Sequence, residues 1–169
     1  GRARLFAALR RAREAGTRIA FDTNFRARGW PDLDAARRVY AEMFAIADIV
    51  LASTEDLLPL YPGADDADLL ARIPALETVL KLASPRCIVR AEGNEQMVNA
   101  APLVQPVVDT TAAGDSFAAA YLAARLGGAS AVEAAQAGHR LAGVVVCYPG
   151  AIIPRAEMPA NVVSGEVIT

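Results

Sequence analysis

Residues 109–115 have the sequence DTTAAGD, with one carboxylate at each end of a run of small and polar residues. An alanine-rich run follows directly, which predicts that Asp115 stands in the first turn of a helix. The small side chains of Ala112, Ala113 and Gly114 leave backbone N–H groups open at that helix N-terminus. Open N–H groups and the helix dipole together bind anions, so we predict a phosphate site at this turn.

A carboxylate beside a phosphate site can act as a general base, which is the role we predict for Asp115. It would take the proton of a hydroxyl group as that hydroxyl attacks a phosphoryl group. The open N–H groups would stabilise the charge on the transferred oxygens. A structural explanation also fits, because an acid in the first turn complements the helix dipole and small residues allow close packing. The chain has no G-x-x-x-x-G-K-[ST] sequence, which excludes a Walker P-loop.

The elements that must position this turn alternate between helix and strand. Apolar spacing, caps and breakers predict helices over residues 3–15, 31–47, 65–83 with an interruption near Pro74, and 131–147, plus a helix starting at Ser53 or Thr54. Strands are predicted over 18–24, 48–53 and 86–92, with a hairpin turning at Gly93 and Asn94 and an extended segment over 102–109. This order predicts an α/β fold with a mostly parallel sheet covered by helices on both faces.

Three polar clusters follow predicted strands or extended segments. They are DTNFR at 22–26, STED at 53–56 and DTTAAGD at 109–115. Ligands of open α/β sheets bind beyond the carboxyl ends of the strands, so we expect one cleft to collect all three clusters.

Composition excludes several other classes of protein. The 169 residues suit one domain, and the net charge of −2 without a Lys/Arg block argues against nucleic-acid binding. No uncharged apolar run is long enough to cross a membrane, and the N-terminus lacks the pattern of a signal peptide. Cys87 and Cys147 lie in apolar segments and are expected to be free thiols in a reducing cytoplasm. A single histidine makes a zinc site improbable.

The DTTAAGD stretch and the helix after it resemble the C-terminal signature of the ribokinase-like (PfkB) family of sugar kinases, D-T-x-x-A/G-G-D. The resemblance implies a ribokinase-like fold and ATP-dependent phosphorylation of a sugar, with Mg²⁺ bridging the phosphates. It makes Asp115 the catalytic base and Ala112, Ala113 and Gly114 the anion hole, with Gly114 also at the nucleotide. Some relatives use a monovalent cation, which the resemblance would place near Asp109.

Two further stretches resemble the members of this family that phosphorylate 2-keto-3-deoxygluconate. FDTNFRARGW at 21–30 is similar to their D-x-N-x-R-x-x-x-W segment, and residues 137–159 are similar to their tail, including G-A-I-I-P. The implied product is the 6-phosphate of this sugar acid. Arg26 would pair with the substrate carboxylate and Asn24 with a hydroxyl group.

Other readings of these stretches stay open. Arg26 is also explained as a surface arginine in a loop. Another sugar kinase of the same family, such as a fructokinase or a 5-dehydro-2-deoxygluconokinase, fits the shared signature equally well. A non-catalytic nucleotide-binding fragment is the alternative from a different class.

The nucleotide side matches the family less closely. Ser53 and Asp56 stand where the family has an N-x-x-E motif near magnesium and phosphate, although a capped helix start explains both residues. Residues 88–96 resemble the family's glycine-bearing turn, but Gly93 is the one glycine among them. Two glutamates stand where glycines are usual, and their charges would repel a triphosphate. Arg90 would offset them. His139 lies on the helix that the family places against the adenine, with a packed histidine as the alternative.

Family members are longer than this chain and begin with strands, a Gly-Gly sugar-binding segment and a β-sheet lid that have no counterpart here. The resemblance therefore implies that residues 1–169 are the C-terminal portion of a single ribokinase-like domain. The full-length parent is expected to be a cytoplasmic homo-oligomer. Catalysis needs the sugar held in line and water excluded, so this portion alone is expected to be weakly active or inactive.

Overall fold

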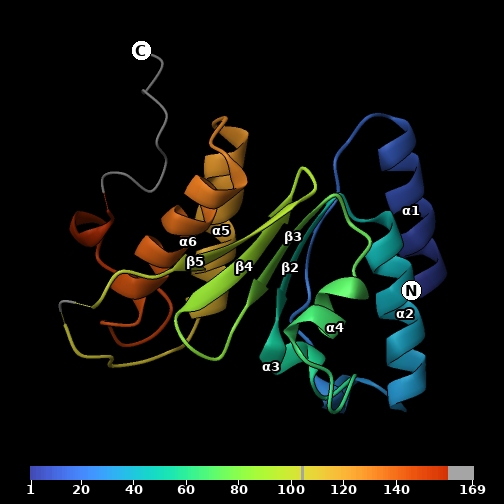
Figure 1. Cartoon of the computed structure of the whole chain (residues 1–169), viewed down its shortest axis with the longest axis horizontal. Coiled ribbons are helices and arrows are strands. Elements are labelled where there is room, and N and C mark those ends of the chain that lie inside the picture. Colours follow the sequence, from blue (N-terminus) through green and yellow to red (C-terminus); the bar gives the residue numbers. More distant parts are fainter. Residues whose placement is uncertain (104, 160–169) are drawn as a thin grey trace. The chain divides into compact units, whose positions relative to one another are not determined.

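The computed structural model describes residues 1–103 and 105–159, and its chain divides into two compact units. Unit 1 contains residues 1–83 and 90–95, and unit 2 contains residues 84–89 and 96–169. The strands form a mixed five-stranded sheet in the order β1-β2-β3-β4-β5 (Figure 1). The predicted α/β class is confirmed.

Unit 1 carries the parallel part of the sheet. Its elements are α1 (Arg2–Glu14), β1 (Ala20–Asp22), the 3₁₀ turn η1 (Ala27–Gly29), α2 (Leu33–Ile46), β2 (Ile49–Ser53), α3 (Thr54–Leu57), α4 (Asp66–Ala71) and β3 (Glu77–Lys81). Strand β2 pairs in parallel with both β1 and β3, and Asp22, Leu51 and Val79 share one register position. The carboxyl ends of all three strands therefore lie at the same edge of the sheet.

Local sequence explains the main elements of unit 1. The run IVLAS of β2 is buried on both faces up to Ala52, as expected for a central parallel strand. Helix α2 starts where the Asp32 side chain accepts a hydrogen bond from the N–H of Ala35. Its buried face carries Tyr40, which packs edge-on against neighbouring aromatic rings. Helix α1 lies beside α2, where Arg10 pairs with Glu42 (Figure 1).

The prediction of helix over 65–83 was wrong in its second half. Only the short α4 is helical there, and residues 77–81 form β3 in the parallel part of the sheet. Pro74 cannot continue the helix, and the following run ETVLKL is too short for its apolar spacing to separate strand from helix.

A hairpin follows β3 and joins the two units. It consists of β4 (Arg86–Ala91) and β5 (Asn94–Asn99), and a two-residue connection makes such strands antiparallel. The turn residues are Glu92 and Gly93, both with positive φ, at 53° and 78°. A type I′ turn requires positive φ at both central positions. The predicted hairpin is therefore present, with its turn one residue earlier than predicted.

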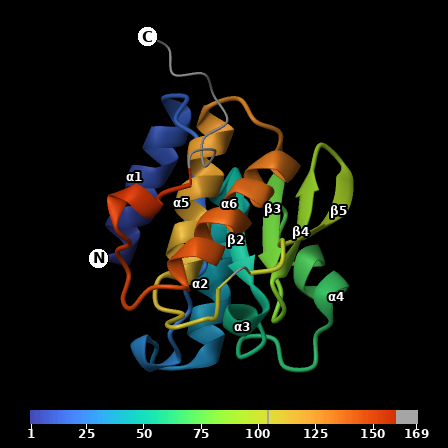
Figure 2. The ribbon, with the colours of Figure 1, turned by 90° about the vertical axis from the view of Figure 1, so that its left-hand side faces the viewer.

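Unit 2 is built around two helices, α5 (Ala113–Leu126) and α6 (Ala131–Val145), followed by the 3₁₀ turn η2 (Arg155–Glu157). The helices lie side by side (Figure 2). The predicted capping box of Ser130 and Glu133 at the start of α6 is confirmed. Close packing depends on Gly138, because a Cβ atom there would lie 2.8 Å from the ring of Phe117.

The predicted extended segment at 102–109 contains no strand in its described residues, and Val104 lies outside them. Residues 160–169 of the predicted domain also lie outside the described part. Within residues 1–103 and 105–159, no helix is both long and apolar enough to cross a membrane.

Candidate functional site

The predicted phosphate site lies in unit 2, at the start of α5. Helix α5 begins at Ala113, and Ala112 before it adopts the left-handed conformation with φ 60° and ψ 15°. The N–H of Ala113 donates to the carbonyl oxygen of Thr110 over 3.2 Å, so it is not open as predicted. Among the described residues, the N–H groups of Gly114 and Asp115 have no acceptor. The N–H of Ala112 also has no acceptor among the described residues, so the N–H groups of Ala112, Gly114 and Asp115 can meet an anion.

Asp115 stands in the first turn of α5, and its side chain is exposed. The left-handed Ala112 turns the chain so that the exposed first turn of the helix carries this carboxylate beside the open N–H groups. The geometry therefore agrees with the predicted placement of a base next to an anion site. The structural explanation, in which Asp115 only complements the helix dipole, requires the same placement, so both explanations stay open.

Asp109 ties two loops of unit 2 together. One carboxylate oxygen accepts a hydrogen bond from the N–H of Thr111 over 2.8 Å, and the other accepts from the N–H of Gly150 over 2.9 Å. A hydrogen bond from the side chain of Thr111, followed by these two backbone hydrogen bonds, holds the pKa of Asp109 below its usual value. Both oxygens are engaged in holding backbone, so the residues present do not support the expected cation site at this side chain.

Two of the three predicted polar clusters meet at the carboxyl edge of unit 1. The hydroxyl of Thr23, just after β1, donates to Asp56 Oδ2 over 2.7 Å. The Nη1 atom of Arg26 lies 3.5 Å from Asp56 Oδ1. We call Thr23, Arg26 and Asp56 the carboxyl-edge cluster. It brings the DTNFR and STED stretches into direct contact, as predicted for strands that end at the same edge.

Ser53 and Asp56 act as parts of a helix start. The Ser53 side chain accepts a hydrogen bond from the N–H of Asp56 over 3.1 Å, which caps α3. Asp56 is buried, with 8% of its surface exposed, and both its carboxylate oxygens face protein groups. Across residues 1–103 and 105–159, no group of three or more His, Cys, Asp or Glu could hold a metal ion. Among the described residues, Asp56 therefore does not belong to a cluster of acidic ligands of that size.

Arg26 and Asn24 lie in the loop after β1. The Arg26 side chain is 73% exposed, and its Nη1 atom also donates to the carbonyl oxygen of Phe25 over 2.9 Å. Within the described part of the chain, the Nε and Nη2 atoms of Arg26 make no contact with a protein acceptor. Asn24 is exposed and has a positive φ of 34°. Both side chains are therefore accessible to a ligand, and their roles in substrate binding stay predictions.

The sequence interpretation missed Tyr40 and Lys81 at this edge. Tyr40 donates a hydrogen bond to the carbonyl oxygen of Thr23, and Lys81, at the end of β3, lies 3.6 Å from a carboxylate oxygen of Asp22. Recognising β3 as a parallel strand would have placed Lys81 here. Nothing in the sequence around Tyr40 indicates which backbone oxygen its hydroxyl reaches.

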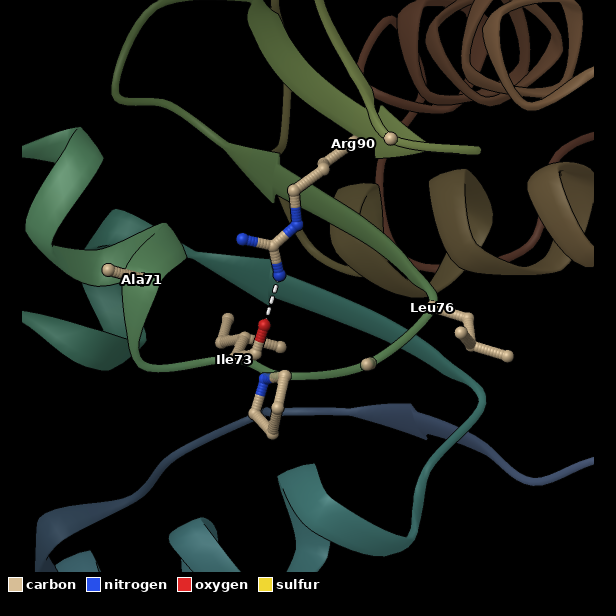
Figure 3. A pocket seen from close by; sticks show the side chains of 7 residues that line it. Ala71, Ile73, Leu76 and Arg90 are labelled. Atoms are coloured by element: carbon tan, nitrogen blue, oxygen red, sulfur yellow. Dashed lines mark hydrogen bonds between the residues drawn. The ribbon is translucent and has the colours of Figure 1, made fainter.

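Arg90 and Gly93 are predicted to lie at the nucleotide together with Ser53. In unit 1 they lie near the start of β3, whereas Ser53 pairs with Lys81 at the end of that strand. The guanidinium of Arg90 donates to the carbonyl oxygen of Ile73 (Figure 3). It also donates to the carbonyl oxygen of Leu70 over 2.8 Å and reaches Thr78 Oγ1 near the start of β3. Gly93 lines the same surface hollow. Arg90 therefore binds one carbonyl in the last turn of α4 and one just after it, and neither Arg90 nor Gly93 lies at the edge where Ser53 and Asp56 lie.

His139 packs inside unit 2. Its ring meets Phe117 edge-on at 5.0 Å between centroids, and its Nε2 atom is buried without a hydrogen-bond partner. Burial lowers the pKa of His139, and a hydrogen bond with the backbone of Val98 raises it by less. These contacts agree with the alternative interpretation of a packed histidine.

Comparison with known proteins matches residues 2–158 to the pfkB family carbohydrate kinases. The chain is 40% identical over 165 residues to the 2-dehydro-3-deoxygluconokinases of Dickeya dadantii and of Escherichia coli K12, covering 94% of this chain and 53% of each relative. It is 34% identical to the fructokinase of Vibrio alginolyticus, over 72% of this chain and 40% of that protein. The chain thus spans about half the length of these relatives.

Solved structures show the same fold. The aminoimidazole riboside kinase of Salmonella enterica superposes with a TM-score of 0.72 at 26% identity, covering 89% of this chain and 51% of that one. The 2-dehydro-3-deoxygluconokinase of Thermotoga maritima superposes with a TM-score of 0.73 at 21% identity, over 88% and 50% of the two chains. The fold is therefore ribokinase-like, and the match over residues 2–158 shows that this chain belongs to the pfkB family of carbohydrate kinases.

Proposed function

We propose that the protein to which this chain belongs transfers a phosphoryl group from ATP to the terminal hydroxyl of 2-keto-3-deoxygluconate and forms the 6-phosphate. The observation that carries the proposal is the start of α5, where exposed Asp115 stands beside the open N–H groups of Gly114 and Asp115. The 40% identity with two 2-dehydro-3-deoxygluconokinases supports the choice of substrate. The family match over 2–158 supports one ribokinase-like domain of which this chain is the C-terminal portion.

In the proposed reaction, Asp115 accepts the proton of the sugar hydroxyl as the oxygen attacks the γ-phosphorus. The new P–O bond forms while the bond between that phosphorus and the β,γ-bridging oxygen breaks, and ADP leaves. The N–H groups of Gly114 and Asp115 stabilise the negative charge of the transferred phosphoryl oxygens. Mg²⁺, carried by the nucleotide phosphates, supplies further charge neutralisation when bound. A structure of a relative, the Salmonella aminoimidazole riboside kinase, is described as a complex with its riboside and an ATP analogue.

Arg26 supports a sugar acid over a neutral sugar. Its exposed side chain presents Nε and Nη2, which form the edge of a guanidinium that pairs with a carboxylate through two parallel hydrogen bonds. The carboxylate of 2-keto-3-deoxygluconate would meet this edge of the guanidinium.

A fructokinase activity is the second candidate, because the chain is 34% identical to the Vibrio alginolyticus enzyme. The two candidates differ in what they ask of Arg26. A neutral ketose offers no carboxylate, so the replacement Arg26→Ala would weaken a sugar-acid kinase selectively and a fructokinase much less.

The test is ADP release from ATP and Mg²⁺ with 2-keto-3-deoxygluconate, fructose or ribose as acceptor. It is run on this chain and on the chain extended upstream in its own gene, because the chain spans about half the length of its relatives. Asp115→Asn serves as the blank, and loss of its base should slow turnover at least about 100-fold. Turnover of fructose in preference to the keto acid, or full activity in Asp115→Asn, would refute the proposal.

A further inference from the structure

The guanidinium of Arg26 is held on one side only. Its Nη1 atom donates to the carbonyl oxygen of Phe25 and lies 3.5 Å from Asp56 Oδ1. The side chain of Arg26 is 73% exposed, whereas that of Asp56 is 10% exposed. An exposed guanidinium thus rests on a buried carboxylate.

Asp56 is itself fixed by two strands. Its Oδ2 atom accepts the hydroxyl of Thr23, and its N–H donates to Ser53 at the end of β2. Thr23 is anchored in turn, because its N–H donates to the carbonyl oxygen of Leu51 over 3.0 Å and its own carbonyl accepts from Tyr40. The carboxylate therefore has a defined position relative to the carboxyl ends of β1 and β2.

This arrangement leaves a particular edge of Arg26 for a ligand. With Nη1 directed at Asp56 and Phe25, the Nε and Nη2 groups donate no hydrogen bond within the described residues. A free arginine side chain loses rotamer freedom when it binds, and an anchored one loses less. The anchor therefore favours binding of a planar carboxylate at the remaining edge.

We propose that Asp56 is a positioning residue for the substrate carboxylate, acting by holding Arg26 in the orientation that receives it. The inference rests on the proposed function, since it assigns the Nε and Nη2 edge of Arg26 to the sugar acid. It differs from a metal or phosphate role for Asp56, because both carboxylate oxygens are already directed at Thr23 and Arg26.

The chain offers a closely matched control at the other edge of the sheet. Asp48 precedes β2, accepts a hydrogen bond from the N–H of Ile19 over 2.8 Å, and lies 3.4 Å from Arg13. Its side chain is 16% exposed, against 10% for Asp56. Asp56→Asn and Asp48→Asn therefore remove equivalent charges from equivalent pairs, and only the first removes the anchor of Arg26.

The first readout is rotation of the Arg26 guanidinium, measured by nitrogen-15 NMR on the ligand-free chain. Rotation should be faster in Asp56→Asn and unchanged in Asp48→Asn. The second readout is the affinity for 2-keto-3-deoxygluconate and for fructose, measured by NMR titration of the same variants and of Arg26→Ala, each made in the chain extended upstream. Asp56→Asn should weaken binding of the acid about fivefold and leave fructose binding unchanged.

The outcomes separate the two proposals. Rotation that is unchanged in Asp56→Asn overturns the positioning role. Acid affinity that falls in Arg26→Ala but not in Asp56→Asn also overturns the positioning role alone. Acid affinity that is absent, or that Arg26→Ala leaves unchanged, overturns the carboxylate assignment and the positioning role with it. Faster rotation together with selectively weaker acid binding supports both.

Discussion

The phenolic hydroxyl of Tyr40 donates a hydrogen bond of 2.6 Å to the carbonyl oxygen of Thr23. The ring is buried, and burial, followed by the negative charge of Asp56, raises the pKa of Tyr40 from 10.0 to about 12. This bond connects the core of α2 to the loop that carries Arg26. The protonated phenol is thus the form that the folded state favours.

Stability should fall at alkaline pH because of Tyr40. The folded-state pKa of Tyr40 is above the ordinary value of 10.0. The stabilisation that the protonated phenol contributes to the fold is therefore fully present below pH 10.0 and is lost as pH rises through about 12. Tyr40→Phe should cost about 1 kcal/mol in the free energy of unfolding at neutral pH. Urea denaturation at neutral pH and near pH 11 measures both effects. Equal alkaline losses in the variant and the parent chain would contradict this role for Tyr40.

Gly138→Ala should destabilise the helix pair of unit 2. The added Cβ would lie 2.8 Å from the ring of Phe117, which is closer than packed carbon atoms approach. Overpacking of this kind costs about 1–3 kcal/mol, measurable as a lower midpoint in urea denaturation. Gly143→Ala is the matched control on the same helix, since its Cβ would meet only the flexible end of Leu103 at 3.1 Å. The double variant Gly138→Ala with Phe117→Leu should recover part of the loss.

His139 should make the chain less stable in mild acid. Burial lowers its pKa below the ordinary 6.5, so the fold favours the neutral ring. The stabilisation that the neutral ring of His139 contributes to the fold is fully present above pH 6.5. It is lost as pH falls from 6.5 toward the folded-state pKa. His139→Leu should remove this dependence, because the chain has one histidine and its Nε2 atom makes no hydrogen bond. Thermal denaturation at pH 8 and pH 5.5 tests it, and an unchanged acid slope in the variant would refute it.

Asp109→Ala should free the two loops that this carboxylate holds. The N–H groups of Thr111 and Gly150 would lose their acceptor and exchange faster with deuterated water. Protection should fall at both amides together, although they are far apart in the sequence. Asp109→Asn, which keeps an acceptor oxygen, should show a smaller effect. Faster exchange at one amide only would mean that Asp109 does not join the loops.

Sequence reasoning located the parallel strands β1 and β2 and the start of α6, because each has a local signal. Strand β2 is a continuous apolar run, and Ser130 with Glu133 forms a capping box. Strand β3 has no such signal, since its five residues ETVLK mix polar and apolar side chains and suit either a helix segment or a strand. Its partner in the sheet, β2, decides the matter, and that pairing is a long-range contact.

The missed strand also explains why Arg90 and Gly93 do not lie beside Ser53 and Asp56. Without β3, the next turn that contains a glycine along the sequence is the one at Gly93. The structure puts Gly93 with Arg90 near the beginning of β3, while Lys81 marks the end that shares an edge with Ser53. The motif at Asp115 depended on no such count of strands, because its residues are contiguous and start a helix.

The hydrogen bonds of the Asp109 carboxylate connect two segments that are far apart in the sequence. Residues 109 and 150 are joined by one hydrogen bond, and the N–H groups of Val108 and Asp109 donate to the carbonyl oxygen of Val146, so the entrance to α5 and the exit from α6 are fastened to each other. Neither helix can fray from that end without loosening the other. The turn that carries Asp115 is therefore held by residues that follow both helices in the sequence. We expect this turn to be among the last parts of unit 2 to become ordered during synthesis.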